Sequence, residues 1–364
     1  MNIALFGGAF NPPHNEHLKV ISEAKKALNL DQCVIFPSYL PPHKRTADGT
    51  PFELRVKMCE LAFPDCVVSK IEKESSDVNY AVNTVKKFQE LYKGDKLFYI
   101  IGGDSMADIF KWYKPEILFS LVDIVVYPRE GRIKEMYDAI ARAREMGAKI
   151  HLINVMSDNV SSGEIRYLSA ISANLEGLVS LEVERFIKNN LLYTTSLTEI
   201  LNARLNERTY LHSIRTAIWA MKLNRKLALP IKDVFEASLL HDVAKDDAVT
   251  DGVPTDAVGS PVAHQFRGAK VLKDMGFNDD VVQAVAYHTT GCKNMNMLQK
   301  LIFCADMTEE GRKFDGVEEL RNSLLKDFQL GFKACLKRTY QFLIEKGADI
   351  YPLTKDAYLF YLDK

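Results

Sequence analysis

The sequence predicts an α/β domain with a doubly wound parallel sheet, followed by an all-α domain. In the first half, short apolar runs alternate with helical periods, which is typical of a parallel sheet covered by helices on both faces. After about Tyr193 the strand-like runs stop and only helical periods continue. A length of 364 residues also suits two domains of ordinary size better than one core.

Four apolar runs flanked by Gly, Pro or Asp are the expected strands, and they cover residues 3–6, 33–36, 97–101 and 122–126. A helix before the third run carries Ala81, Val85, Phe88 and Tyr92 on one face. Ligands of doubly wound sheets bind at the carboxyl ends of the strands, so the segments that follow these runs are the candidate site segments. Residues 1–10 lack a basic n-region, which predicts a first strand and not a signal peptide.

The second half is expected to be a bundle of helices. The polar residues 193–196 predict a boundary between domains that cover 1–193 and 196–364, with Ser196 or Thr198 as a helix cap. Two apolar stripes on the helices that follow consist of Ile214, Ala217, Ile218 and Met221, and of Val234, Ala237 and Leu240-His241.

The composition argues against several classes of partner. A net charge of −1 without a long basic run argues against binding to nucleic acid. No apolar run is long enough to cross a bilayer, so no membrane partner is expected. The six cysteines include no C-x-x-C pair, which predicts reduced thiols in a cytoplasmic protein. The oligomeric state, including a homo-oligomer, stays open.

Residues 7–17 form the most specific segment of the first half, because they follow the first expected strand and open the first helix. Gly7 and Gly8 allow backbone amides to approach phosphate oxygens, and the start of a helix adds positive potential. His14 and His17 are three residues apart on the first turn, so both imidazoles are expected to face a bound anion.

Three further segments, residues 41–44, 102–105 and 161–166, are expected to follow strands. Taken singly, each is also explained as a turn, a Gly-rich cap or the start of a helix. Taken together, they predict a site that holds phosphates with Lys44 and Arg166 and offers Asp104 to a ribose.

These strings resemble the signature of bacterial nicotinate-nucleotide adenylyltransferases, within the nucleotidyltransferase superfamily marked by a His-x-Gly-His motif. The resemblance covers about residues 1–193 and implies that adenylyl transfer from ATP to nicotinate mononucleotide, with magnesium, yields nicotinate adenine dinucleotide and pyrophosphate. The implied catalytic residues are His14, His17, Lys44 and Arg166. The implied ATP-binding residues are Gly7, Gly8, Phe10, His14, His17, Asp104, Ser161, Ser162 and Arg166. The implied mononucleotide-binding residues are Lys44, Thr84, Trp112 and Arg129.

The chain departs from this signature at one position, where Glu16 replaces the glycine of the motif. A carboxylate that faced the phosphates of ATP would repel them, so Glu16 is expected to point outward and ATP affinity is the property in question. Two alternatives stay open in this half. Trp112 is either a stacking partner of the nicotinate ring or a core residue, and another adenylyltransferase of the superfamily, such as one for pantetheine phosphate, is the rival activity.

The second half carries an ordered set of metal-ligating residue types, namely His212, His241, Asp242, His264, His288 and Asp306. Imidazole and carboxylate ligands suit iron, manganese and similar ions. A single buried histidine is as often a hydrogen-bonded core residue as a ligand. The complete ordered set favours a metal site.

This order resembles the HD superfamily, and more narrowly its bacterial branch that hydrolyses diadenosine tetraphosphate. The resemblance spans about residues 196–325 and implies two metal ions, iron or alternatively manganese, with the carboxylate of Asp242 between them. It further implies that Lys245, with Arg312 as a further candidate, neutralises charge on the phosphate, and that a dinucleoside polyphosphate is cut symmetrically into two ADP. The alternatives are an HD enzyme for guanosine alarmones, one for another nucleotide or for a phosphomonoester or diester, and a nucleotide-sensing or dimerising module.

Overall fold

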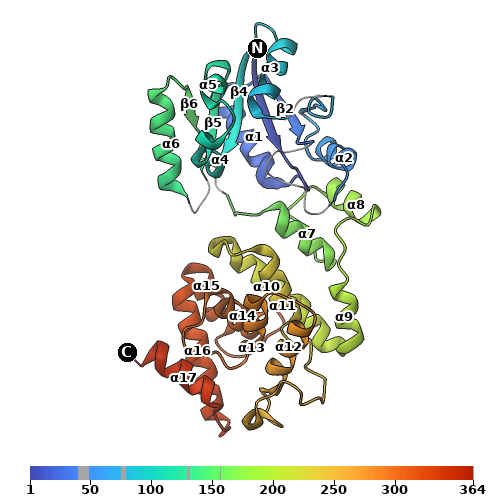
Figure 1. Cartoon of the computed structure of the whole chain (residues 1–364), viewed down its shortest axis with the longest axis vertical. Helices are drawn as coiled ribbons and strands as arrows, with labels where there is room; N and C mark the ends of the chain where they lie inside the picture. Colours follow the sequence, from blue (N-terminus) through green and yellow to red (C-terminus); the bar gives the residue numbers. More distant parts are fainter. Residues whose placement is uncertain (40–48, 75–78, 129–131, 156, 364) are drawn as a thin grey trace. The chain divides into compact units, whose positions relative to one another are not determined.

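A computed structural model describes residues 1–39, 49–74, 79–128, 132–155 and 157–363 of the chain. The chain divides into two compact units, Met1–Thr194 and Thr195–Lys364, whose elements are labelled in Figure 1. The described residues contain no helix with both the length and the hydropathy that a membrane crossing requires.

The first unit is built around a parallel sheet in the order β3-β2-β1-β4-β5-β6. Its strands are β1 (Asn2–Gly8), β2 (Gln32–Pro37), β3 (Val67–Val68), β4 (Lys96–Gly102), β5 (Asp123–Tyr127) and β6 (Ile150–Leu152). The predicted fold class is therefore confirmed, and the four predicted strands are the central ones. The edge strands β3 and β6 were not predicted, because two or three residues are too few for a periodic signal.

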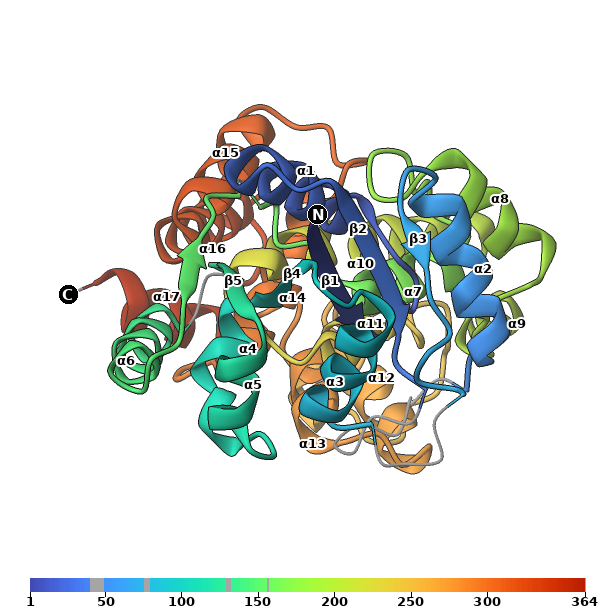
Figure 2. The same cartoon turned by 90° about the horizontal axis from the view of Figure 1, so that it is seen from above.

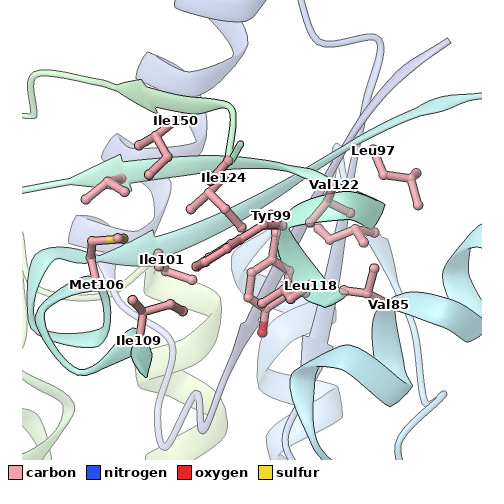
Figure 3. Close-up of a cluster of buried hydrophobic side chains, with 14 of the residues drawn as sticks. Val85, Leu97, Tyr99, Ile101, Met106, Ile109, Leu118, Val122, Ile124 and Ile150 are labelled. Carbon is pink, nitrogen blue, oxygen red and sulfur yellow. The ribbon is translucent and has the colours of Figure 1, made fainter. Parts of the chain in front are cut away.

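The sheet is covered on both faces. Its helices are α1 (Asn15–Leu28), α2 (Phe52–Ala62), α3 (Ala81–Leu91), α4 (Gly103–Ala107), η1 (Ile109–Lys111), α5 (Pro115–Leu121), α6 (Ile133–Glu145), α7 (Ser162–Ala170) and α8 (Leu181–Asn189). Figure 2 shows α3, α4 and α5 on one side of the sheet and α1 on the other. Side chains of α3 to α6 belong to one buried cluster with Leu5, Tyr99 and Ile124 of the strands. Figure 3 shows Tyr99 and Ile124 among its members. Phe6 and Ile100, whose side chains point to the opposite face of the sheet, are also buried. Burial of both faces is expected when helices cover both sides of a parallel sheet.

The second unit is helical throughout its described residues. Its helices are α9 (Leu197–Arg204), α10 (Glu207–Leu227), α11 (Ile231–Leu240), η2 (Thr255–Ala257), α12 (Ala263–Asp274), α13 (Asp279–Ala286), α14 (Met297–Thr308), α15 (Val317–Lys326), α16 (Phe328–Glu345) and α17 (Pro352–Leu362). Ser196 precedes α9 as predicted, but its side chain makes no capping bond; the Thr195 hydroxyl accepts from the N–H of Leu197 instead.

The two predicted apolar stripes differ in how deeply their side chains are buried. Val234 and Ala237 on α11 are fully buried, as expected for a central helix. On α10 the buried face runs through Ala217 and Ala220, whereas Ile214 is only half-buried. The small residues of α10 allow close packing against α11, which brings the histidines at the two helices near each other.

Candidate active sites

The first candidate site begins where β1 ends. Gly7 pairs with Phe36 of β2, and a Cβ on Gly7 would come within 2.4 Å of the Phe36 ring. Glycine is therefore required here for packing within the sheet, in addition to the predicted access of its amide to a ligand. Phe10 then takes a left-handed conformation with φ of 45°, in the turn that leads to α1.

His14 and His17 lie against each other at the start of α1, with ring centroids 3.7 Å apart. The backbone N–H of His14 donates to Nδ1 of His17 at 3.1 Å. Because Nδ1 of His17 accepts this bond, a neutral His17 carries its proton on Nε2, and that atom is a hydrogen-bond donor. His14 is buried and His17 is half-buried. The fold thus fixes the ring of His17 as a donor at a helix N-terminus.

The predicted segment 161–166 lies beside this turn. Ser161 caps α7 by accepting from the N–H of Glu164. The Ser162 hydroxyl donates to the carbonyl of Pro12, and Nη1 of Arg166 donates to the carbonyl of Asn11, each at 2.8 Å. Two segments about 150 residues apart in the chain are therefore joined at the end of β1.

Asp104, which was predicted to contact the ribose of ATP, is exposed on the first turn of α4, directly after β4. Since β1 and β4 are parallel neighbours, the ends of these two strands share one edge of the sheet. Lys44 and Arg129 lie outside the described residues, and their predicted roles stay predictions.

The two residues expected near the pyridine ring have partners within the protein. The Trp112 ring is half-buried and packs nearly perpendicular to the Tyr99 ring, with the ring centroids 6.4 Å apart. Thr84 is buried, and its hydroxyl lies 3.4 Å from Oε1 of Glu72. Burial raises the pKa of Glu72 above its ordinary value, against the opposing hydrogen bonds that the backbone N–H of Tyr39 and the Thr84 hydroxyl donate to it.

The expectation that Glu16 points outward is wrong. Glu16 is 6% exposed, and its Oε1 lies 2.7 Å from Nζ of Lys19. The expectation rested on repulsion between this carboxylate and the phosphates of ATP. The ion pair with Lys19, three residues further along α1, makes burial possible.

The second candidate site gathers all six predicted ligands of the helical unit. His212 comes from α10, His241 and Asp242 from the end of α11, His264 from α12, His288 from the residues after α13, and Asp306 from α14. Their ligand atoms form three overlapping groups, each within 4.8 Å, namely His212 with His241 and Asp242, His241 with His288 and Asp306, and Asp242 with His264 and His288.

Asp242 lies between two pairs of histidines. Its Oδ2 is 3.6 Å from Nε2 of His241 and 3.9 Å from Nε2 of His212. Its Oδ1 is 3.2 Å from Nε2 of His264 and 3.3 Å from Nε2 of His288. One carboxylate thus presents a different oxygen to each pair.

The other ring nitrogen of each histidine is held by a hydrogen-bond acceptor. Nδ1 of His241, His264 and His288 lies 2.8 Å from the carbonyls of Ser238, Pro261 and Val285, respectively. Nδ1 of His212 lies 3.1 Å from Oε1 of Glu309. Each Nδ1 therefore donates, and each Nε2 faces the cluster as a potential ligand, which is the arrangement of metal-bound histidines. The donor set of imidazoles and carboxylates fits divalent transition metals.

The charges within the cluster shift several pKa values. Although burial disfavours its ionised form, the neighbouring His241, His264 and His288 hold the pKa of Asp242 well below its ordinary value. Burial lowers the pKa of His241 to about 3, so this ring is neutral and able to bind a cation. Burial opposes protonation of His212, but the adjacent carboxylates of Asp306 and Glu309 raise its pKa to about 9.

Two cationic side chains border the cluster. Nζ of Lys245 lies 3.3 Å from Oδ1 of Asp242 and 3.0 Å from Nε2 of His264. Nη2 of Arg312 lies 2.5 Å from Oδ1 of Asp306. Lys245 and Arg312, the two predicted cations, thus both border the cluster of possible metal ligands.

Sequence reasoning missed Glu309. Its side chain is 2% exposed and binds both His212 and Nε of Arg215, the latter at 2.7 Å. These contacts keep its carboxylate ionised: burial works against this, but His212 and Arg215 lower the pKa of Glu309 to about 2. Its position three residues after Asp306, at the end of the same helix, was the available signal.

Comparisons with known proteins separate the two units in the same way. A Cytidylyltransferase-like family model matches residues 5–168, and an HD domain model matches residues 209–326. A "Probable nicotinate-nucleotide adenylyltransferase" of Geotalea daltonii is 32% identical over 212 residues, covering 53% of this chain and 98% of the relative. A protein with the same description from Pseudothermotoga lettingae is 33% identical over 195 residues, covering 50% of this chain and 93% of the relative.

Among solved structures, a predicted HD superfamily hydrolase involved in NAD metabolism from Clostridium acetobutylicum is 28% identical, with a TM-score of 0.43, covering 46% of this chain and 96% of that one. The Plasmodium falciparum nicotinic acid mononucleotide adenylyltransferase complexed with NaAD is 20% identical, with a TM-score of 0.46, covering 53% of this chain and 97% of that one.

Fold, site and family models together define a nucleotidyltransferase-type α/β domain joined to a helical HD domain with a cluster of possible metal ligands. The chain belongs, through its first unit, to the nicotinate-nucleotide adenylyltransferase family.

Proposed function

We propose that the first unit transfers the adenylyl group of ATP to nicotinate mononucleotide. The observation that carries this proposal is the pair His14 and His17 at the start of α1, preceded by a turn whose Asn11 and Pro12 carbonyls accept from Arg166 and Ser162 of α7. Nucleotide phosphates bind favourably at such a position, where a helix N-terminus and cationic or donor side chains converge. The names of the relatives from Geotalea daltonii and Pseudothermotoga lettingae support nicotinate mononucleotide as the acceptor.

The reaction needs no covalent intermediate with the protein. A 5′-phosphate oxygen of the mononucleotide forms a bond to the α-phosphorus of ATP, supplied as its magnesium complex, while the bond from that phosphorus to the oxygen bridging to the β-phosphate breaks and pyrophosphate leaves. The protein contributes positioning and stabilisation of the charge that develops on the phosphate oxygens. Nε2 of His17 donates a hydrogen bond to one such oxygen, and Arg166 supplies positive charge held in place by Asn11.

The test is an assay of the full chain with Mg-ATP and either nicotinate mononucleotide or nicotinamide mononucleotide, with products separated by chromatography. Nicotinate adenine dinucleotide and pyrophosphate are the expected products, and nicotinate mononucleotide is expected to be the preferred acceptor. Transfer to phosphopantetheine, with neither mononucleotide accepted, would instead assign the rival activity.

For the helical unit, we infer a metal-dependent hydrolase of dinucleoside polyphosphates. The supporting observation is that the Nε2 atoms of four histidines and two carboxylates converge, while the Nδ1 atom of each of these histidines makes a hydrogen bond to an acceptor outside the cluster. Two ions fit this set: Asp242 offers one oxygen to the side of His212 and His241, and the other to His264 and His288. When bound, such ions supply Lewis-acid activation of water and of a phosphoryl oxygen.

The residues around the ligands support a phosphate-bearing substrate. Lys245 and Arg312 place two cations beside the cluster, where they neutralise charge on a polyphosphate. Diadenosine tetraphosphate, cut symmetrically into two ADP, is the proposed substrate, with iron as the native metal and manganese as the alternative.

The test is incubation of full-length protein, metallated with iron or manganese under anaerobic conditions, with diadenosine tetraphosphate. Two molecules of ADP per substrate are expected. ATP plus AMP would contradict the proposed position of attack. Cleavage of bis(p-nitrophenyl) phosphate or of a guanosine alarmone without cleavage of diadenosine tetraphosphate would assign another substrate class. No cleavage of any of these by metallated protein would favour a nucleotide-sensing or dimerising module.

A further inference from the structure

Glu16 is a buried carboxylate on the helix turn that carries the two histidines proposed to bind ATP. It lies on the first turn of α1 between His14 and His17, the residues proposed to face the phosphates. Its Oε1 binds Nζ of Lys19 at 2.7 Å, whereas its Oε2 is buried and makes no hydrogen bond within the described parts of the chain. Lys19 is therefore the counter-charge that the structure provides for this carboxylate.

Lys19 also makes an ion pair with a second carboxylate. Its Nζ lies 2.8 Å from Oδ2 of Asp158, in the segment that leads into α7. The Asp158 side chain is 70% exposed, so solvent screens that contact more than the one to buried Glu16. Hydrogen bonds to Asp158 and Glu16 raise the pKa of Lys19 above its ordinary value. The ammonium thus lies between α1 and the segment before Ser161.

We propose that Lys19 is a positioning residue for ATP, which neutralises Glu16 and so allows a carboxylate to replace the motif glycine beside the phosphate site. This inference rests on the proposed adenylyltransferase function. Without Lys19, a buried and unpaired carboxylate would lie on the same helix turn as His14 and His17, and it would repel the negative charges of the ATP phosphates in a poorly screened environment. The mononucleotide carries a single phosphate and would be affected less.

The test compares the full-length wild type with Lys19→Met, Lys19→Arg and the double variant Glu16→Gly/Lys19→Met. Lys19→Met is expected to raise KM for ATP about tenfold, as one lost charge contact of ordinary strength does, while KM for nicotinate mononucleotide and kcat change less than about threefold. Lys19→Arg and the double variant should both return close to wild type. The matched control is Lys26→Met, since Lys26 pairs with Glu23 at the same spacing and distance on the exposed part of α1.

Equilibrium binding of Mg-ATP by calorimetry separates this inference from the proposed function. Weaker binding to Lys19→Met, restored in the double variant, supports the inference even if the wild type fails to use nicotinate mononucleotide. Unchanged ATP binding in folded Lys19→Met would overturn it. A double variant as impaired as Lys19→Met would also overturn it, because the defect would then not arise from the charge of Glu16. If Lys19→Met does not fold, Lys19→Gln and the double variant give the same comparison.

Discussion

Nδ1 of His212 donates toward the carboxylate of Glu309 at 3.1 Å, whereas the Nδ1 atoms of His241, His264 and His288 donate to main-chain carbonyls. A carboxylate partner makes an imidazole a stronger electron donor than a carbonyl does, and it fixes the ring orientation. Glu309 is in turn held by Arg215. His212 is thus the candidate ligand whose properties depend most on a second residue.

Glu309→Gln should therefore weaken metal binding by about 10- to 100-fold, the range for the loss of a partner behind a metal-ligating histidine. Competition with a chelator of known affinity measures this directly. The control is Glu310→Gln, because Glu310 is the exposed next residue and belongs to none of the groups of possible metal ligands in the described structure. Equal metal affinity in both variants would contradict a role for Glu309.

His17→Ala should reduce adenylyl transfer by about two to three orders of magnitude, the usual effect of removing one preorganised donor to a developing charge. Phosphohydrolase activity should persist, since the proposed metal ligands lie in the other unit. The measurement is a pair of assays on one preparation, with circular dichroism as the control for folding. Loss of both activities in a folded variant would contradict two separate sites.

Trp112→Ala should raise KM for nicotinate mononucleotide more than KM for ATP, because only the mononucleotide carries the ring proposed to stack on Trp112. Stacking on an aromatic ring contributes about 1 kcal/mol, which corresponds to about a fivefold change in KM. Steady-state kinetics with each substrate varied in turn give the comparison. If both KM values rise equally and the melting temperature falls, the contact of Trp112 with Tyr99 is a core contact and not part of a binding site.

Asp242→Ala should abolish hydrolysis and lower the metal content from two ions per chain, because each oxygen of this carboxylate serves a different pair of histidines. Metal analysis of purified protein, together with the transferase assay, checks this. Transferase activity should stay within about twofold of wild type, since the alteration is confined to the helical unit. A variant that retains both ions would show that Asp242 does not lie between them.

Much of the fold could be predicted because the signals are local. The runs that became β1, β2, β4 and β5 are apolar on both faces, and this pattern alone requires a sheet buried between helices. The end of strand-like runs near Tyr193 likewise located the change to helices. Strands β3 and β6 escaped prediction because their few residues form strands only through pairing with a neighbour.

The sequence by itself determined the residue types of both sites and their order along the chain, since ligand chemistry depends on side-chain identity. Only the tertiary structure decided which atoms meet. The two-sided placement of Asp242, the support of His212 by Glu309 and the burial of Glu16 all arise from contacts between specific side-chain atoms. Packing sets these distances, and the free energy of a charge in a folded protein depends on the partners that packing brings within a few ångströms.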